Sequence, residues 1–181
     1  MIKEKNHNRL LIVLFFTISF IAIFVRLFKL TEIPYGVQID EAGMGYDSFL
    51  LANYGIDRYG NFLPVYLINF GGGQSALYAY FCAFLYKLTG VHNLLIMRLP
   101  NVTVNIIAYF AGIYIINETL INKSWTVFAA FVLAILPYFV TQCRYALDCN
   151  LLVNMLTISV AVLFCAFKRK INLFSFWRDS F

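Results

Sequence analysis

The chain has 181 residues, of which 61% are hydrophobic and 13% are charged, whereas soluble domains carry about 25% charged residues. A globule of this length cannot hide so many apolar side chains, so the composition excludes an ordinary soluble protein and indicates a membrane protein. The net charge of +5 does not indicate a nucleic-acid partner, because the basic residues flank apolar runs and form no basic face.

Five apolar stretches follow one another along the chain, at about 10–30, 74–90, 99–118, 125–141 and 149–167. A membrane-spanning helix needs about 20 residues, and the cytoplasmic ends of such helices are rich in Lys and Arg. The basic residues near the N-terminus (Lys3, Lys5, Arg9) place that end in the cytoplasm. The run Lys168-Arg169-Lys170 places the end of the last stretch on the same side. The number of crossings must then be even, and we expect four.

The stretch 74–90 is the one that we expect not to cross. It is the shortest, glycines bracket it, and its tyrosines favour the boundary between membrane and water. We predict an interfacial helix on the outer surface. The fold class that follows is an all-α integral membrane bundle, whose long first extracytoplasmic loop (about 31–98) carries juxtamembrane helices. Arg26, at the outer end of the first span, is expected to snorkel to the interface.

Within the outer loop, the pattern of apolar residues predicts a helix from Asp40 to Tyr54 that ends at Gly55. Residues 57–61 have the composition of a turn. Residues 62–70 are rich in aromatic and β-favouring side chains but too few to cross a membrane. Gly71-Gly72-Gly73 is interpreted as a flexible joint before the interfacial helix, because neither a strand nor a Lys-Ser/Thr pair marks a phosphate loop there.

Asp40 and Glu41 are the most informative pair of residues in the sequence. Adjacent carboxylates that open a helix beside a membrane suit general-base chemistry, since a carboxylate can accept a proton from an attacking hydroxyl. The alternative is structural: Asp40 caps the helix and Glu41 complements the helix dipole. Local sequence favours the cap.

The order of several short motifs resembles the first extracytoplasmic loop of the GT-C glycosyltransferases. The branch that it resembles is the superfamily of protein O-mannosyltransferases and aminoarabinose transferases. The motifs are Ile33-Pro34-Tyr35-Gly36, Asp40-Glu41-Ala42-Gly43, Tyr46-Asp47, Gly55-Ile56-Asp57, Gly60, Pro64, Leu77-Tyr78-Ala79-Tyr80, Arg98-Leu99-Pro100 and Arg144-Tyr145-Ala146-Leu147-Asp148. The Ala42-Gly43 pair departs from the family, in which bulky residues often follow the carboxylates.

The resemblance implies transfer of a sugar from a polyprenyl-phosphate donor to an acceptor outside the membrane, which is a glycan, a lipid or a protein. It assigns the base to Asp40, with Glu41 as its neighbour or substitute, and substrate contacts to Arg144 and Asp148. Contact of Arg58 with substrate is a prediction from its place in the turn. No cofactor is expected, and the isolated His7 and His92 indicate no metal site. A location in a bacterial plasma membrane is expected. Members of the family are several hundred residues long, so residues 1–181 are expected to be the N-terminal part of one domain.

Other interpretations of the same residues remain open. Arg144 suits a lipid phosphate through its bidentate guanidinium, but it could instead pair with Asp148 on the surface. Arg58 could belong to a solvated charge pair with Asp57, and Arg98 is expected to be an interfacial anchor. Two other functions compete with the enzyme, namely a transporter or lipid flippase subunit and a non-catalytic assembly partner. Span interiors nearly free of charge argue against transport.

Overall fold

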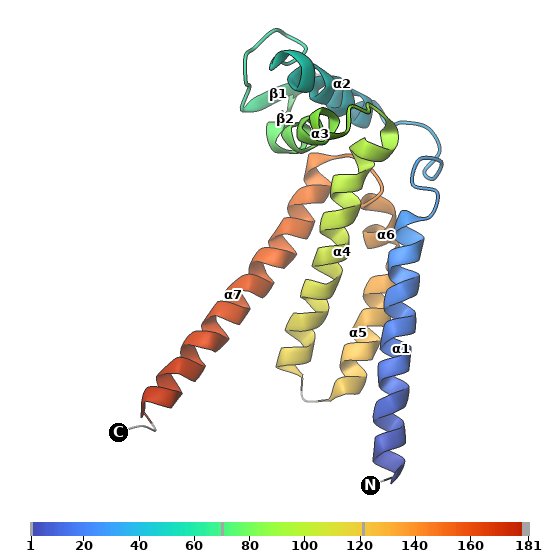
Figure 1. Ribbon diagram of the computed structural model, residues 1–181, viewed down its shortest axis with the longest axis vertical. Coiled ribbons are helices and arrows are strands. Elements are labelled where there is room, and N and C mark those ends of the chain that lie inside the picture. Colours follow the sequence, from blue (N-terminus) through green and yellow to red (C-terminus); the bar gives the residue numbers. More distant parts are fainter. Residues whose placement is uncertain (1, 70, 121, 179–181) are drawn as a thin grey trace.

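The computed structural model describes residues 2–69, 71–120 and 122–178, and the side chains of residues 6–69, 71–120 and 122–169. Its long helices form a bundle, and a smaller layer of two helices and a β-hairpin lies across one end of it (Figure 1). We call this layer the head (residues 39–89). The elements are α1 (Ile2–Leu27), α2 (Ile39–Tyr54), β1 (Tyr66–Asn69), β2 (Gly72–Ser75), α3 (Ala76–Thr89), α4 (Leu94–Thr119), α5 (Lys123–Ile135), α6 (Pro137–Gln142) and α7 (Asp148–Arg178).

Three helices of the described chain are long and apolar enough to cross a membrane, over Asn6–Leu27, Leu94–Thr119 and Asp148–Arg169. Their outward faces carry large apolar side chains, such as Phe20, which is 70% exposed, and Val162, which is 62% exposed. Such faces are costly in water but need no protein partner in lipid. The architecture is therefore that of a helical membrane protein. It also contains a small β-hairpin, whereas a purely helical fold was predicted.

The predicted span 125–141 is not one continuous helix. α5 ends at Ile135, and α6 begins at Pro137. Proline has no N–H to donate and its ring obstructs the preceding turn, so the helix breaks there. α5 runs beside α1, and α6 continues toward the head (Figure 1). The prediction of a single helix was wrong because the apolar run continues through the proline.

The break at Pro137 leaves the Leu133 carbonyl oxygen without the N–H that residue 137 of a regular helix would supply. Arg26 supplies a donor instead, because its Nη2 lies 3.0 Å from that oxygen while its Nε donates to Asn105 Oδ1 at 2.6 Å. Arg26 is 1% exposed, and its guanidinium lies 5.5 Å from the centre of the Tyr109 ring. The expectation that Arg26 snorkels was therefore wrong, since the bundle interior offers it oxygen and aromatic partners.

A row of buried asparagines joins α4 to α7. Asn105 Nδ2 donates to Asn154 Oδ1 at 2.9 Å, and Asn154 Nδ2 donates to Asn101 Oδ1 at 3.3 Å. Asn101 Nδ2 in turn donates to the Tyr145 carbonyl at 2.7 Å. Side-chain hydrogen bonds between membrane helices stabilise their association by roughly 0.6 kcal/mol each. The row sets the rotation of α7 against α4, and so it directs the first residue of α7, Asp148, at the head.

The head packs on the bundle through a shared apolar core. It contains residues of α2, α3 and β1 together with residues at the starts of α4 and α7, namely Met44, Leu51, Leu67, Ala76, Tyr78, Ala79, Cys82, Ala83, Met97, Ala146 and Leu151. Tyr78 Oη also donates to the Met97 carbonyl at 2.7 Å, which ties α3 to α4. The predicted interfacial helix 74–90 is thus α3, and it lies with α2 across the end of the bundle (Figure 1).

The loop elements of the head follow the sequence prediction in part. The helix predicted over 40–54 is confirmed as α2, and Gly55 ends it with a φ of 70°. The prediction of a flexible joint at Gly71-Gly72-Gly73 was wrong, because Gly72 and Gly73 belong to β2. This strand pairs antiparallel with β1, with Ser75 opposite Tyr66 and Gly72 opposite Asn69. Glycine lets the second strand pass close to the first, and a Cβ at Gly73 would overlap the Tyr66 ring.

The N-terminus, the α4–α5 turn and the C-terminal end of α7 all lie at the end of the bundle far from the head (Figure 1). Lys123 and Lys168 are at this end, and Lys168 pairs there with Glu118. The segments that carry Lys3, Lys5 and Lys170 are at the same end, although their side chains lie outside the described residues. That this end is cytoplasmic stays a prediction of the positive-inside rule.

Candidate functional site

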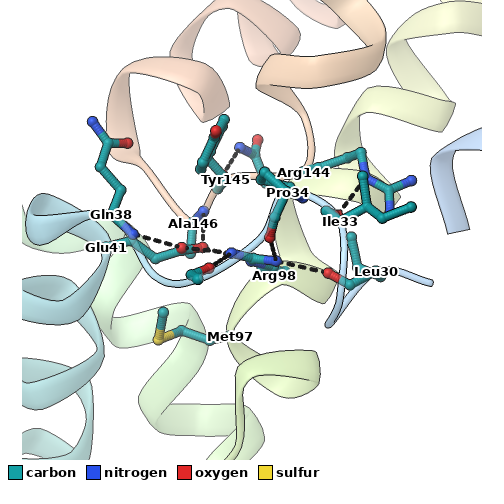
Figure 2. A network of polar contacts seen from close by, with 12 residues as sticks. Leu30, Ile33, Pro34, Gln38, Glu41, Met97, Arg98, Arg144, Tyr145 and Ala146 are labelled. Atoms are coloured by element: carbon teal, nitrogen blue, oxygen red, sulfur yellow. Dashed lines mark hydrogen bonds and ion pairs between the residues drawn. The ribbon is translucent and has the colours of Figure 1, made fainter.

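The second carboxylate of the predicted pair, Glu41, is fully buried in a salt bridge with Arg98 (Figure 2). Arg98 Nε lies 2.8 Å from Glu41 Oε1, and Arg98 Nη2 lies 2.8 Å from Oε2. The Ala146 backbone N–H donates to Oε1 at 2.9 Å, and the Gln38 N–H donates to Oε2 at 3.4 Å. Both Glu41 oxygens therefore join α2 to α4 and to the segment that leads into α7.

Arg98 uses its remaining N–H groups to hold the loop between α1 and α2. Nη1 donates to the Leu30 carbonyl at 2.8 Å and to the Pro34 carbonyl at 3.3 Å, and Nη2 donates to the Gly36 carbonyl at 2.9 Å. The expectation of an interfacial anchor was wrong, because Arg98 is 0% exposed. A buried guanidinium is tolerated here since a carboxylate and three carbonyls replace its hydration.

Asp40, the neighbour of Glu41, lies in a different environment. It is half-buried at the second position of α2, and its Oδ1 accepts a hydrogen bond from Asn69 Nδ2 at 2.9 Å. The N-cap of α2 is Gln38, and Glu41 is the carboxylate that accepts the N-cap N–H. The capping alternative was therefore wrong for Asp40, which lies in the first turn of α2 but does not accept the N-cap N–H.

Arg58 and Asn69 connect Asp40 to the buried Asp47. Arg58 holds both Asp47 oxygens, with Nη2 at 2.8 Å from Oδ2 and Nε at 3.1 Å from Oδ1, and its Nη1 donates to Asn69 Oδ1 at 3.0 Å. The hydrogen bonds to Asp47 raise the pKa of Arg58 above its ordinary value. A Cβ at Gly43 would lie 2.6 Å from Arg58 Nη2 and 2.9 Å from Asn69 Oδ1. The glycine after the carboxylate pair thus makes room for the network.

The solvated pair of Asp57 and Arg58 does not form, because Asp57 stabilises its own turn. Its Oδ1 accepts the Tyr59 and Asn61 N–H groups at 2.9 and 2.8 Å, and its Oδ2 accepts Asn61 Nδ2 at 2.8 Å. Burial opposes the charged carboxylate, but the hydrogen bonds from Asn61, Tyr59 and Gly60 outweigh it and lower the pKa of Asp57. Arg58 accordingly contacts Asp47 and not its neighbour.

Asp148, the first residue of α7, contacts the start of α3. Its Oδ2 accepts the Ser75 N–H at 2.7 Å, and its Oδ1 accepts the Cys149 N–H at 2.8 Å. Asp148 therefore pairs N–H groups at the starts of α3 and α7, where a carboxylate also complements the helix dipoles.

Arg144 caps the end of α1. Its Nε donates to the Ile33 carbonyl at 2.8 Å (Figure 2). Its Nη1 and Nη2 donate to the Val25 and Phe28 carbonyls at 2.6 Å each. The last carbonyls of a helix lack intrahelical donors, and Arg144 supplies them while being 5% exposed. Within the described residues Arg144 forms no ion pair with Asp148, since each side chain has other partners.

The structure thus links Asp40, Asn69 and Arg58 through hydrogen bonds, whereas Glu41, Arg144 and Asp148 have other partners. Sequence analysis missed Asn69, because nothing in a short strand marks one amide as the partner of a distant carboxylate. Among the residues that the structure describes, no group of His, Cys, Asp or Glu is placed to hold a metal ion. Comparisons with protein-family models, curated proteins and solved structures found no match to this chain.

Proposed function

We propose that the chain is part of a membrane glycosyltransferase that transfers a sugar from a polyprenyl-phosphate donor to an extracytoplasmic acceptor. One observation carries the proposal. Of two adjacent carboxylates, Glu41 is fixed in a buried salt bridge, whereas Asp40 is half-buried and its hydrogen-bond partner among the described residues is the neutral amide of Asn69. A carboxylate that is oriented but not neutralised by a cation is suited to accept a proton.

In the proposed reaction, Asp40 takes the proton of the acceptor hydroxyl while the hydroxyl oxygen attacks the anomeric carbon of the sugar. The bond between that carbon and the phosphate oxygen breaks, and the electron pair leaves with the polyprenyl phosphate. Asn69 holds Asp40 in place through its amide, and it is therefore a positioning residue. The head would face the outer leaflet of a bacterial plasma membrane, with the N-terminus in the cytoplasm.

The donor phosphate needs partners other than Arg144, whose donors are occupied by the backbone of residues 25–33. Arg58, which is linked to Asp40 through Asn69, is the cation that we propose for it. The apolar outward faces of α4 and α7 would contact the polyprenyl chain.

The test is the substitution Asp40→Asn in the natural reading frame that contains this chain. The amide oxygen of asparagine can still accept the hydrogen bond from Asn69, so we expect folding and membrane insertion to be unchanged. Asparagine cannot take a proton, and turnover should fall by about 10²–10⁴-fold. The assay measures transfer from radiolabelled polyprenyl-phosphate sugars in membranes.

Glu32→Gln is the matched control for Asp40→Asn. Glu32 is an exposed carboxylate of the loop that precedes α2, paired with Lys29 on the surface, and its loss should leave turnover unchanged. An Asp40→Asn protein with normal expression and normal turnover would remove Asp40 from the mechanism and favour a non-catalytic assembly partner.

A transporter remains the second candidate, because the bundle holds a buried cation, Arg26, which was not expected in a span interior. Its three guanidinium nitrogens each donate to a fixed oxygen, on Asn105, Ala22 and Leu133. Such contacts favour a structural role over a moving charge. Transport of a polyprenyl-phosphate sugar that survives Asp40→Asn would favour the transporter.

A further inference from the structure

An apolar groove of about 350 Å³ opens between α1, α4 and α5. It lies in the half of the bundle far from the head, because its walls come from the start of α1, the end of α4 and the start of α5 (Figure 1). The apolar walls are formed by Leu11, Phe15, Phe16, Phe110, Ile113 and Val127. The proposed reaction uses none of these residues.

The polar residues of the groove gather toward one end of it. Asn8, Asn117 and Lys123 lie closer to the helix termini than the apolar walls do, and Thr126 Oγ1 donates to Asn117 Oδ1 at 3.3 Å. The groove therefore has an apolar length and a polar, cationic end. These two parts of the groove suit an amphiphile that has an anionic headgroup and a hydrocarbon tail.

The two described lysines at this end of the bundle differ in their partners. Lys168 forms an ion pair with Glu118, whereas no ion pair of the described residues includes Lys123. Lys123 is exposed, so its ammonium is available at the depth where lipid headgroups lie. A lysine near the membrane surface attracts anionic lipid with an energy that corresponds to about fivefold in affinity.

The side of the groove is not closed by the described residues. Its lining side chains Ile12 and Phe16 are 56% and 66% exposed, and the nearby Phe128 is 56% exposed. A symmetric second copy of the chain would bring its own Lys123 to the same surface, and two like charges would oppose that contact. Charge and apolar lining together favour a lipid over a copy of the chain as the occupant.

We propose that the groove binds one acyl chain of an anionic phospholipid from the leaflet at the N-terminal end of α1, with the lipid phosphate on Lys123. The bound lipid fills the space between α1, α4 and α5 at the start of the α5–α6 segment. It is distinct from the polyprenyl-phosphate donor of the proposed reaction, since the groove and the head lie at opposite ends of the bundle (Figure 1).

Native mass spectrometry of the full chain tests the proposal, with dioleoyl phosphatidylglycerol and dioleoyl phosphatidylcholine titrated separately. We expect the first phosphatidylglycerol to bind about fivefold more tightly than phosphatidylcholine. Glycerol 1-phosphate, an anionic head without chains, should not compete. Lys123→Gln should abolish the preference, whereas Lys168→Gln removes the same charge from the same end and should preserve it.

Val127→Phe tests the tail site, because it fills the groove without changing the charge. It should weaken binding of both lipids, and Val160→Phe, on the exposed face of α7, should weaken neither. Equal losses of preference in the two lysine variants would show general surface attraction and overturn the proposal. Unchanged lipid binding in Val127→Phe, or a dimer that this substitution disrupts, would overturn it as well.

Discussion

Glu41 and Asp40 are adjacent in sequence and differ in almost every physical respect. Glu41 is buried between α2, α4 and the segment before α7, and it accepts hydrogen bonds from Arg98 and Ala146. Asp40 is half-buried and contacts only the amide of Asn69 among the described hydrogen bonds. Successive helical residues point about 100° apart, so one carboxylate fixes the architecture and the other remains available to a ligand.

The largest expected effect is that of Glu41→Gln on stability. Removal of one charge of a buried ion pair leaves Arg98 uncompensated, which costs about 3–5 kcal/mol. Thermal unfolding in detergent measures it, and Asp40→Asn in the same assay should be nearly silent. Equal stabilities of the two variants would show that Glu41 stabilises the fold no more than Asp40 does.

Arg144→Lys should have the next largest effect. Lysine lacks the planar fork of arginine and cannot reach the carbonyls of Ile33, Val25 and Phe28 together. We expect a loss of about 1–3 kcal/mol, the cost of leaving buried acceptors unpaired, and faster hydrogen exchange over residues 25–33. A higher donor KM in the enzyme assay with unchanged stability would restore the predicted phosphate contact.

Gly43→Ala should disturb the Asp40 surface with little change in overall stability. Alanine favours the helix by about 1 kcal/mol relative to glycine, but its Cβ would displace the Arg58 guanidinium from Asn69. These effects oppose each other, so the unfolding temperature should change little while amide exchange in β1 and β2 accelerates. Unchanged exchange would mean that the network does not hold the hairpin.

Acidification should produce the smallest effect, confined to the turn at residues 57–61. The folded-state pKa of Asp57 is lowered by its hydrogen bonds, so the carboxylate stabilises the turn fully above the unfolded-state value of about 3.9. This contribution is lost as the pH falls below that value and through the folded-state pKa. Hydrogen-exchange protection factors of the turn between pH 5 and 3 measure the loss, and Asp57→Asn should make these factors independent of pH.

Local signals in the sequence predicted local structure well. α2 and its end at Gly55 followed from apolar spacing and a left-handed glycine, and the turn at Asp57 followed from its composition. The β-hairpin was missed because Gly71-Gly72-Gly73 has no strand propensity of its own. Pairing with β1 overrides that weakness.

The long-range partners of the charged residues could not be predicted from the sequence. Glu41 and Arg98 are 57 positions apart, and no spacing rule connects residues of two helices at that separation. The same limit applies to Asp40 with Asn69 and to Asp148 with Ser75. Charged residues beside apolar runs were interpreted as interfacial, whereas the irregular loop after α1 offers carbonyls that make burial of Arg98 and Arg144 possible.

The contact between Arg26 and the Leu133 carbonyl pairs two unfavourable features that come from distant parts of the chain. A proline in α5–α6 exposes an acceptor inside the bundle, and an arginine in α1 brings a charge that needs acceptors. Each alone is a burden in lipid, and together they are complementary. The losses of unfolding free energy caused by Pro137→Ala and Arg26→Met should therefore be non-additive. The double variant should lose less unfolding free energy than the sum of the two single losses. In evolution, these positions would be free to change only as a pair.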